Sequence, residues 1–324
     1  MSTESDAASV PPPRRRSVVR IESLAVLALF CGVLSFLSPY FLSVANILNV
    51  LLATSVIGVL AYGATFVIAA AGIDLSLGSV LGLAGVAGAL SMNQLGLPWP
   101  AGVLVFLAAG AACGCMNGLI VTLGRIPPFI VTLGTLGVAR GLALVLTNGA
   151  PVYGLDPAFV YLGQGRPAGI PTPVIIFLGV GAICHFVLSY TRFGKYAVVI
   201  GDNESAARAM GIRVDRLRVA LYSLAGLLAG VSGLLFAART NAGDPTAGVS
   251  YELTAITATV LGGTNLFGGR ATIFGTLVGA LIMGVLQNGL NLMAVSSFYQ
   301  QILIGVVLVL AVWLDQINQR RAKR

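Results

Sequence analysis

From Ile21 to Gly124 the chain contains no lysine or arginine. A soluble surface needs charged side chains in every region, whereas the hydrocarbon core of a membrane excludes them. Over the whole chain, apolar residues make up 57% and charged residues 9%, against about 45–50% and about 25% in soluble domains. These values exclude a soluble enzyme, a soluble nucleic-acid-binding domain and a disordered scaffold. The solvent for most of this chain is therefore lipid.

Apolar runs separated by glycine, proline and asparagine predict about ten membrane spans, because about 20 apolar residues cross the hydrocarbon core. The predicted fold class is an all-α polytopic membrane protein in which some helices are broken. The eighth run is too short to cross as a straight helix and is predicted to be a half-helix or a broken span. The predicted spans are 24–38, 47–70, 77–93, 101–122, 129–147, 173–190, 218–239, 252–262, 271–292 and 298–314.

The net charge of +8 comes from basic residues that gather before the first span, in the loop 191–217 and at the C-terminal end. Cytoplasmic loops carry the excess of lysine and arginine, so both termini and this loop are predicted to be cytoplasmic. No basic stripe that would bind nucleic acid is present. The predicted domains are a disordered cytoplasmic tail (1–23), a transmembrane domain (24–315) and a basic cytoplasmic tail (316–324).

Glycines recur four residues apart in several spans, a spacing that lets helix backbones approach closely in lipid. We expect this spacing to serve close packing within the chain rather than dimerisation. The sets are Gly110/Gly114/Gly118, Gly226/Gly230 and Gly275/Gly279.

Ionisable residues within the spans are costly, so each is a functional candidate. Asp74 lies between the second and third spans, where it either caps the next helix or lines a transport path. Arg140 interrupts the fifth span, and Asp74 is a candidate partner for it. Glu252 and Asp315 are interpreted as helix-end residues near water. One histidine and four cysteines in apolar runs predict no metal site, and no ATP-binding motif is complete, so no cofactor is expected.

The loop 191–217 is predicted to display a short helix on the cytoplasmic side. Asp202 and Asn203 are suited to cap its start, Glu204 lies in its first turn, and Gly211 is suited to end it. A two-turn helix is unstable alone and suits docking into the groove of a partner. The alternative is a surface helix that only connects two spans. The predicted apolar face of this helix consists of Ala206, Ala207 and Met210.

Several short sequence blocks stand out when they are taken together. They are residues 71–79 (AGIDLSLGS), 127–135 (PPFIVTLGT), 139–141 (ARG), 191–194 (TRFG), 201–208 (GDNESAAR) with 211–212 (GI), and 261–264 (LGGT) with 268–269 (GG). Through these blocks, roughly residues 46–315 resemble the permease subunits of ABC-type carbohydrate importers, the ribose, xylose, arabinose and galactoside group. The main departure is Ala71, where the family usually has a glycine, and we expect little consequence from it.

The resemblance implies a non-enzymatic permease subunit that moves a ribose-type monosaccharide across the bacterial inner membrane by alternating access. It implies as partners a separate ABC ATPase, a second permease (identical or related) and a periplasmic sugar-binding protein. It also implies that the short helix within 202–212 contacts the ATPase. The translocation path is expected among Asp74, Ser76, Asn117, Thr132 and Arg140. The alternatives are a branched-chain amino-acid ABC permease and, from another class, a secondary carrier.

Overall fold

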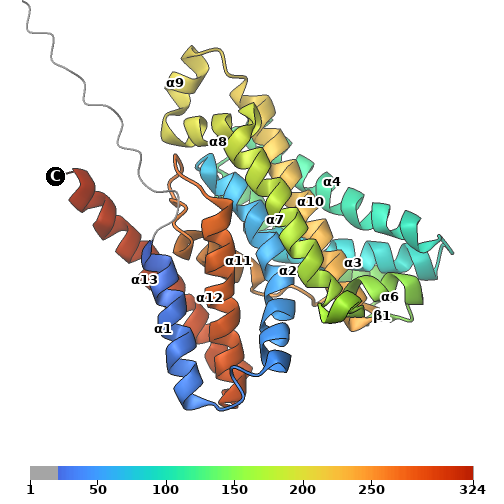
Figure 1. Ribbon diagram of the computed structural model, residues 1–324. Helices are drawn as coiled ribbons and strands as arrows, with labels where there is room; N and C mark the ends of the chain where they lie inside the picture. Colours follow the sequence, from blue (N-terminus) through green and yellow to red (C-terminus); the bar gives the residue numbers. More distant parts are fainter. Residues whose placement is uncertain (1–20, 324) are drawn as a thin grey trace, which may run out of the picture.

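The computed structural model describes residues 21–323, and Figure 1 shows that they form a bundle of helices. The predicted tail before Ile21 lies outside the described residues. The helices in chain order are α1 (Ile21–Leu37), α2 (Val44–Ala69), α3 (Leu77–Asn93), α4 (Trp99–Leu123), α5 (Pro128–Thr147), α6 (Pro157–Gln164), α7 (Thr172–Tyr190), α8 (Arg192–Asp202), α9 (Glu204–Ala209), α10 (Val214–Thr240), α11 (Tyr251–Leu261), α12 (Ile273–Leu292) and α13 (Ser297–Lys323). A 3₁₀ turn, η1 (Pro167–Gly169), and two short strands, β1 (Val152–Tyr153) and β2 (Ala242–Gly243), complete the described part of the chain.

The predicted spans each overlap one helix, namely α1 to α5, α7 and α10 to α13. Seven helices of the described residues are long and apolar enough to cross a membrane, while α1 and α3 are shorter apolar helices. The eighth predicted span is α11, which has only 11 residues and is therefore as short as expected. The all-α polytopic membrane fold class is thus confirmed.

Some boundaries differ from the prediction. The first helix already begins at Ile21, and α13 continues to Lys323, so most of the segment 316–324, predicted as a tail, extends the last helix. The interpretation of Asp315 as a helix-end residue near water is wrong. Asp315 lies inside α13, is 5% exposed, and has its Oδ1 3.8 Å from Nη2 of Arg270 in the α11–α12 loop. A nearby cation compensates for the burial of this carboxylate.

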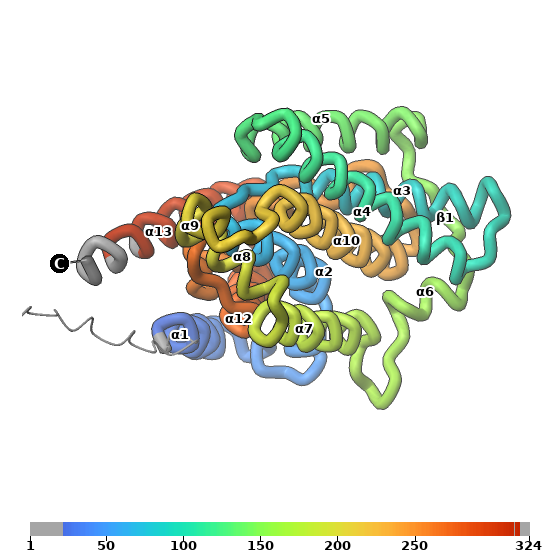
Figure 2. Tube along the Cα trace, turned by 90° about the horizontal axis from the view of Figure 1, so that it is seen from above, coloured from blue at the N-terminus to red at the C-terminus, as the bar shows by residue number. Residues whose placement is uncertain are grey.

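The centre of the molecule is α2, whose residues 54–69 are all buried. Helices α7, α10, α11 and α12 pack around it, and the view from above in Figure 2 shows α7, α10 and α12 beside it. Tyr62 stacks on Phe177 of α7 with ring centroids 5.3 Å apart. Near the start of α2, Asn46 and Asn288 of α12 exchange two amide hydrogen bonds of 3.0 and 2.9 Å. These contacts fix α2 against both neighbours, because a reciprocal amide pair satisfies polar groups that lipid would leave unpaired.

The glycine sets serve packing within the chain, as predicted. Gly110 of α4 lies against the backbone of Gly226 and Gly230 in α10, and Gly118 lies against that of Val219. The same close approach joins α11 and α12, where Gly275 meets the backbone of Gly262. The helix backbones are therefore in direct contact, which only residues without a side chain permit.

The connection between α10 and α11 returns along α3 instead of leaving the helical body. Strand β2 pairs antiparallel with β1, and the chain then follows α3 back toward its first turn. Gly243 lies against Ala89, and Gly248 lies against Gly78. The backbone N of Ala247 donates to the carbonyl oxygen of Asp244 at 3.1 Å, so the chain turns here. The segment 243–248 therefore runs alongside α3 as turns rather than as helix, and α11 begins only after it.

Candidate functional site

The short helix predicted in the loop 191–217 is present as α9, and α8 precedes it. Figure 1 places both at the end of the helical body opposite α6 and β1. The Asn203 side chain caps α9 by accepting a hydrogen bond from Ala206 N at 3.0 Å. Gly211 follows the helix with a φ of 79°, a conformation that favours glycine as the terminating residue. Asp202, predicted as a second capping residue, instead ends α8.

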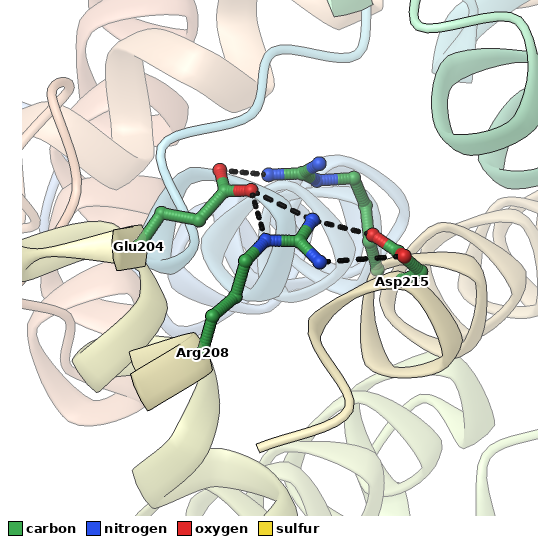
Figure 3. A network of polar contacts seen from close by, with 4 residues as sticks. Glu204, Arg208 and Asp215 are labelled. Atoms are coloured by element: carbon green, nitrogen blue, oxygen red, sulfur yellow. Dashed lines mark hydrogen bonds and ion pairs between the residues drawn. The ribbon is translucent and has the colours of Figure 1, made fainter. Parts of the chain in front are cut away.

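A network of ion pairs fixes α9 on the start of α10 (Figure 3). Glu204 accepts hydrogen bonds from Arg208 at 2.9 Å and from Arg218 at 2.7 Å, and Arg208 also donates to Asp215 at 2.6 Å. Burial alone would raise the pKa of Glu204, but the hydrogen bonds from Arg218 and Arg208 outweigh it and lower this pKa below its usual value. Because the pairs are exposed to solvent they add little stability. Their main effect is to set the orientation of α9.

The predicted apolar face of α9 is only partly correct. Met210 is 65% exposed, and Ala206 is exposed as well. Ala207, however, has no exposed surface and packs into the core of the permease itself. Its exposure on a docking face was therefore predicted wrongly. The reason is the salt-bridge network, which turns this side of α9 toward α10.

An open groove of about 420 Å³ lies beside the exposed end of α9. Its wall combines apolar side chains with the exposed charges of two arginines. The lining residues are Tyr196, Met210, Gly211, Ile212, Arg213, Arg216, Leu217 and Ala220. The groove and Met210 together offer an apolar surface with a basic edge, which suits a partner with an apolar, partly acidic contact face.

A buried polar network joins the α2–α3 loop to α4 and α5. Oδ1 of Asp74 accepts hydrogen bonds from the backbone N of Ser76 at 2.9 Å and from its hydroxyl at 2.6 Å. Asn117 of α4 donates to the Ser76 hydroxyl at 2.9 Å, and Thr135 of α5 donates to Asn117 at 2.5 Å. A single chain of hydrogen bonds therefore links these three parts of the fold.

Four of the five path candidates meet at this network. Thr132 belongs to it through a 3.4 Å hydrogen bond to the carbonyl oxygen of Ile73, next to Asp74. Asp74 is 3% exposed, and Ser76, Asn117 and Thr132 are fully buried. These residues therefore do not line an open path in this conformation. Their geometry supports the turn before α3, since Asp74 holds the backbone of Ser76.

Arg140 lies apart from this network, so its expected pairing with Asp74 is wrong. Its Nη1 donates to the carbonyl oxygens of Pro245 and, at 2.8 Å, Ala247 in the α10–α11 connection. The separation follows from helix geometry, because Arg140 is about 12 Å further along α5 than Thr132. Arg140 thus supplies hydrogen-bond donors to backbone carbonyl oxygens that have no partner within a helix.

Reasoning from the sequence missed Thr135 and the polar residues of the α10–α11 connection, Asp244 and Thr246. One signal could have found the latter pair. The eighth apolar run was too short to cross the membrane, and interrupted spans in transporters often mark functional sites. Thr135 gave no such signal, because a threonine in an apolar span is common.

Seven membrane-length helices among the described residues, packed around a buried polar network, define a polytopic membrane protein. Residues 46–312 match the family described as the permease component of the branched-chain amino acid transport system. The chain belongs to this family.

Curated relatives are similar along nearly the whole chain. The ribose import permease protein RbsC of Escherichia coli (strain K12) is 45% identical, over 92% of this chain and 94% of that protein. RbsC of Bacillus subtilis (strain 168) is 46% identical over 88% of both chains. The D-allose transport system permease protein AlsC of Escherichia coli (strain K12) is 36% identical over 90% of both. No solved structure matched the chain.

Proposed function

We propose that this chain is the permease subunit of an ABC importer that carries a ribose-type monosaccharide across the bacterial inner membrane. The observation that carries the proposal is the 45% identity to a ribose import permease over 92% of the chain. Relatives named for allose and xylose transport point to the same class of cargo. The family description names amino acids, but the curated relatives at 34–46% identity described above and the xylose permease are all named for sugars. The amino-acid alternative is therefore set aside.

We assign the energy source to a separate ATPase that docks at α9. The support is geometric: α9 is held rigidly on α10, and Met210 and the adjacent groove present an apolar surface that no described residue covers. Exposed apolar surface outside the lipid is costly and typical of a protein interface. Residues Asn203 and Glu204 then act as the cap and the anchor of the docking helix, and Ala207 as its packing contact with the permease core.

A glycine contact provides a route from α8 to the polar network. Gly201 near the end of α8 lies directly against the carbonyl of Ala69 at the end of α2 and near the backbone of Gly269 in the α11–α12 loop. Gly269 N donates to Ala69 O at 3.2 Å. With only backbone at the contact, a shift of α8 displaces the start of the Asp74 loop directly, since no flexible side chain lies between them. This arrangement suits transmission of ATP-driven motion in an alternating-access cycle.

A second permease would pack on the outer side of α5. Figure 2 shows α5 at the edge of the bundle, and only Val131, Thr132, Ala139 and Ala143 of this helix are buried. No atom lies within 4 Å of the Cβ positions of Gly134, Gly137 or Gly141. A helix face with small residues suits close packing against another helix in lipid. The translocation path then runs between two permeases, with both termini cytoplasmic and the substrate-binding protein docking at the α6 side.

The test compares Met210→Arg with Ala207→Arg. Met210→Arg should leave permease abundance unchanged, because the side chain is in water. It should reduce ATPase recovery in a pull-down, ATP hydrolysis stimulated by the binding protein, and ribose uptake together, because a charge buried in the interface costs several kcal/mol. Ala207→Arg should instead lower the abundance of the permease itself. Arg192→Ala, near the end of α7, serves as a milder control.

If Met210→Arg retains wild-type ATPase recovery and uptake, α9 only connects two spans and does not dock the ATPase. The secondary-carrier alternative is tested separately in proteoliposomes. An ABC importer loses uptake when ATP hydrolysis is blocked and is unaffected when proton and sodium gradients are removed.

A further inference from the structure

The turn segment 243–248 between β2 and α11 has one polar side and one packed side. Pro245 and Ala247 are buried against α3 and Arg140, whereas Thr246 between them is exposed and Asp244 is half-buried. Oδ1 of Asp244 accepts hydrogen bonds from the Thr246 backbone N and from its hydroxyl, both at 2.7 Å. This turn therefore holds the Asp244 carboxylate and the Thr246 hydroxyl together on the outward side.

This outward side is at the wrong depth for lipid. The carbonyl oxygens of Pro245 and Ala247 lie against Gly82, well inside the length of the apolar helix α3. Non-helical backbone occurs within a membrane only where protein buries it or where it lines a water-filled cavity. Arg140 satisfies two carbonyl groups on the buried side, but an aspartate and a threonine facing hydrocarbon would be expensive. The outward side must therefore face water or a polar molecule.

The groups gathered here have the chemistry that binds sugar hydroxyls. The guanidinium of Arg140 attracts the carboxylates of Asp244 and, from the first turn of α11, Glu252. Oδ1 of Asp244 is occupied by Thr246, and Oδ2 receives no hydrogen bond from the described residues. A carboxylate oxygen accepts a hydrogen bond from a hydroxyl, and the threonine hydroxyl can accept a second one. Such a pair recognises neighbouring hydroxyls on a polyol ring.

We propose that Asp244 and Thr246 form a sugar-hydroxyl subsite of the translocation path, and that Arg140 positions the segment that carries them. This inference rests on the proposed function and adds the residues at which the permease itself contacts its cargo. The subsite explains why α10 and α11 are separated by a non-helical segment. In a continuous helix, residues two apart point in different directions, so Asp244 and Thr246 would not lie together.

Uptake by the assembled transporter tests the subsite. Asp244→Asn retains Oδ1 and with it the turn to Thr246, and Thr246→Val retains the shape of the side chain, so both variants should be recovered with the ATPase in wild-type amounts. Each should lower ribose uptake by about tenfold, the effect of one lost charge-assisted hydrogen bond. Thr246→Val should also change the relative rates for monosaccharides that differ at one hydroxyl.

Wild-type uptake and unchanged sugar preference in both variants would overturn the subsite while leaving the proposed function intact. A wild-type transporter that imports no monosaccharide would overturn the proposed function and the subsite with it.

Thiol labelling gives a readout that does not depend on transport. In a background without native cysteines, Thr246→Cys should react with a membrane-impermeant maleimide, and sugar-loaded binding protein should slow the reaction. The matched control is Ile183→Cys in the middle of α7, which is 65% exposed and should not react because it faces lipid. Failure of Thr246→Cys to react in the assembled transporter would place the segment against lipid or protein and overturn the proposal.

Discussion

The backbone carbonyl of Tyr222 in α10 occupies the space that a side chain on Gly114 in α4 would need. The two helices also touch through Gly110 and Gly118. Direct backbone packing over several turns makes α4 and α10 one rigid unit. This unit carries Asn117 of the polar network on one helix and the anchor of α9 on the other.

Gly114→Leu should destabilise this unit. Overpacking of a tight contact costs about 1–3 kcal/mol, and here the opposing atom is backbone, which cannot rotate away. We expect lower abundance and a lower melting temperature of the purified transporter. Gly179→Leu on α7 is the matched control, because nothing lies within 4 Å of its Cβ position. Equal stability of the two variants would contradict the direct backbone contact between α4 and α10.

Ala71→Gly should stabilise the protein. Ala71 has a φ of 57°, in the left-handed region that costs a residue with a Cβ about 1 kcal/mol. A glycine adopts this conformation without that cost. Ala70, with a φ of −94°, provides the control: Ala70→Gly should bring no gain. Thermal unfolding of both variants measures the effect, and a gain at position 70 but not at 71 would refute this explanation.

Asp74→Ala should lower the amount of assembled permease, because it leaves the backbone N and the hydroxyl of Ser76 without their acceptor in a buried site. Asp74→Asn keeps that acceptor and should assemble and transport normally. Membrane abundance and sugar uptake are measured side by side. If Asp74→Asn assembles fully but does not transport, the carboxylate of Asp74 would instead be needed in the translocation path.

Cysteines at Tyr161 on α6 and Ala206 on α9 should label from opposite sides of the membrane. The background lacks Cys31, Cys113, Cys115 and Cys184. Both positions are exposed at opposite ends of the bundle, and the positive-inside rule assigns α9 to the cytoplasm. An impermeant reagent applied to intact cells should reach Tyr161→Cys alone. Labelling of Ala206→Cys from outside would reverse the topology.

Much of the fold was predictable because each span is an apolar run whose length is set by the thickness of the bilayer. The start and end of α9 were equally readable, because Asn203 and Gly211 are local signals that need no tertiary contact. The helices α6 and α8 were missed because they are amphipathic or short and lie in loops. Their apolar faces can be recognised only once the surfaces that they cover are known.

The sequence by itself determined the membrane class, the positions of the long helices and the spacing of the glycines, since these depend on composition and periodicity. Only the tertiary structure decided which groups meet. It turned Ala207 inward through ion pairs between α9 and α10, and it separated Arg140 from Asp74 by two turns of α5. It also laid the segment 243–248 along α3. Each outcome depends on contacts between residues distant in the chain, which no local pattern encodes.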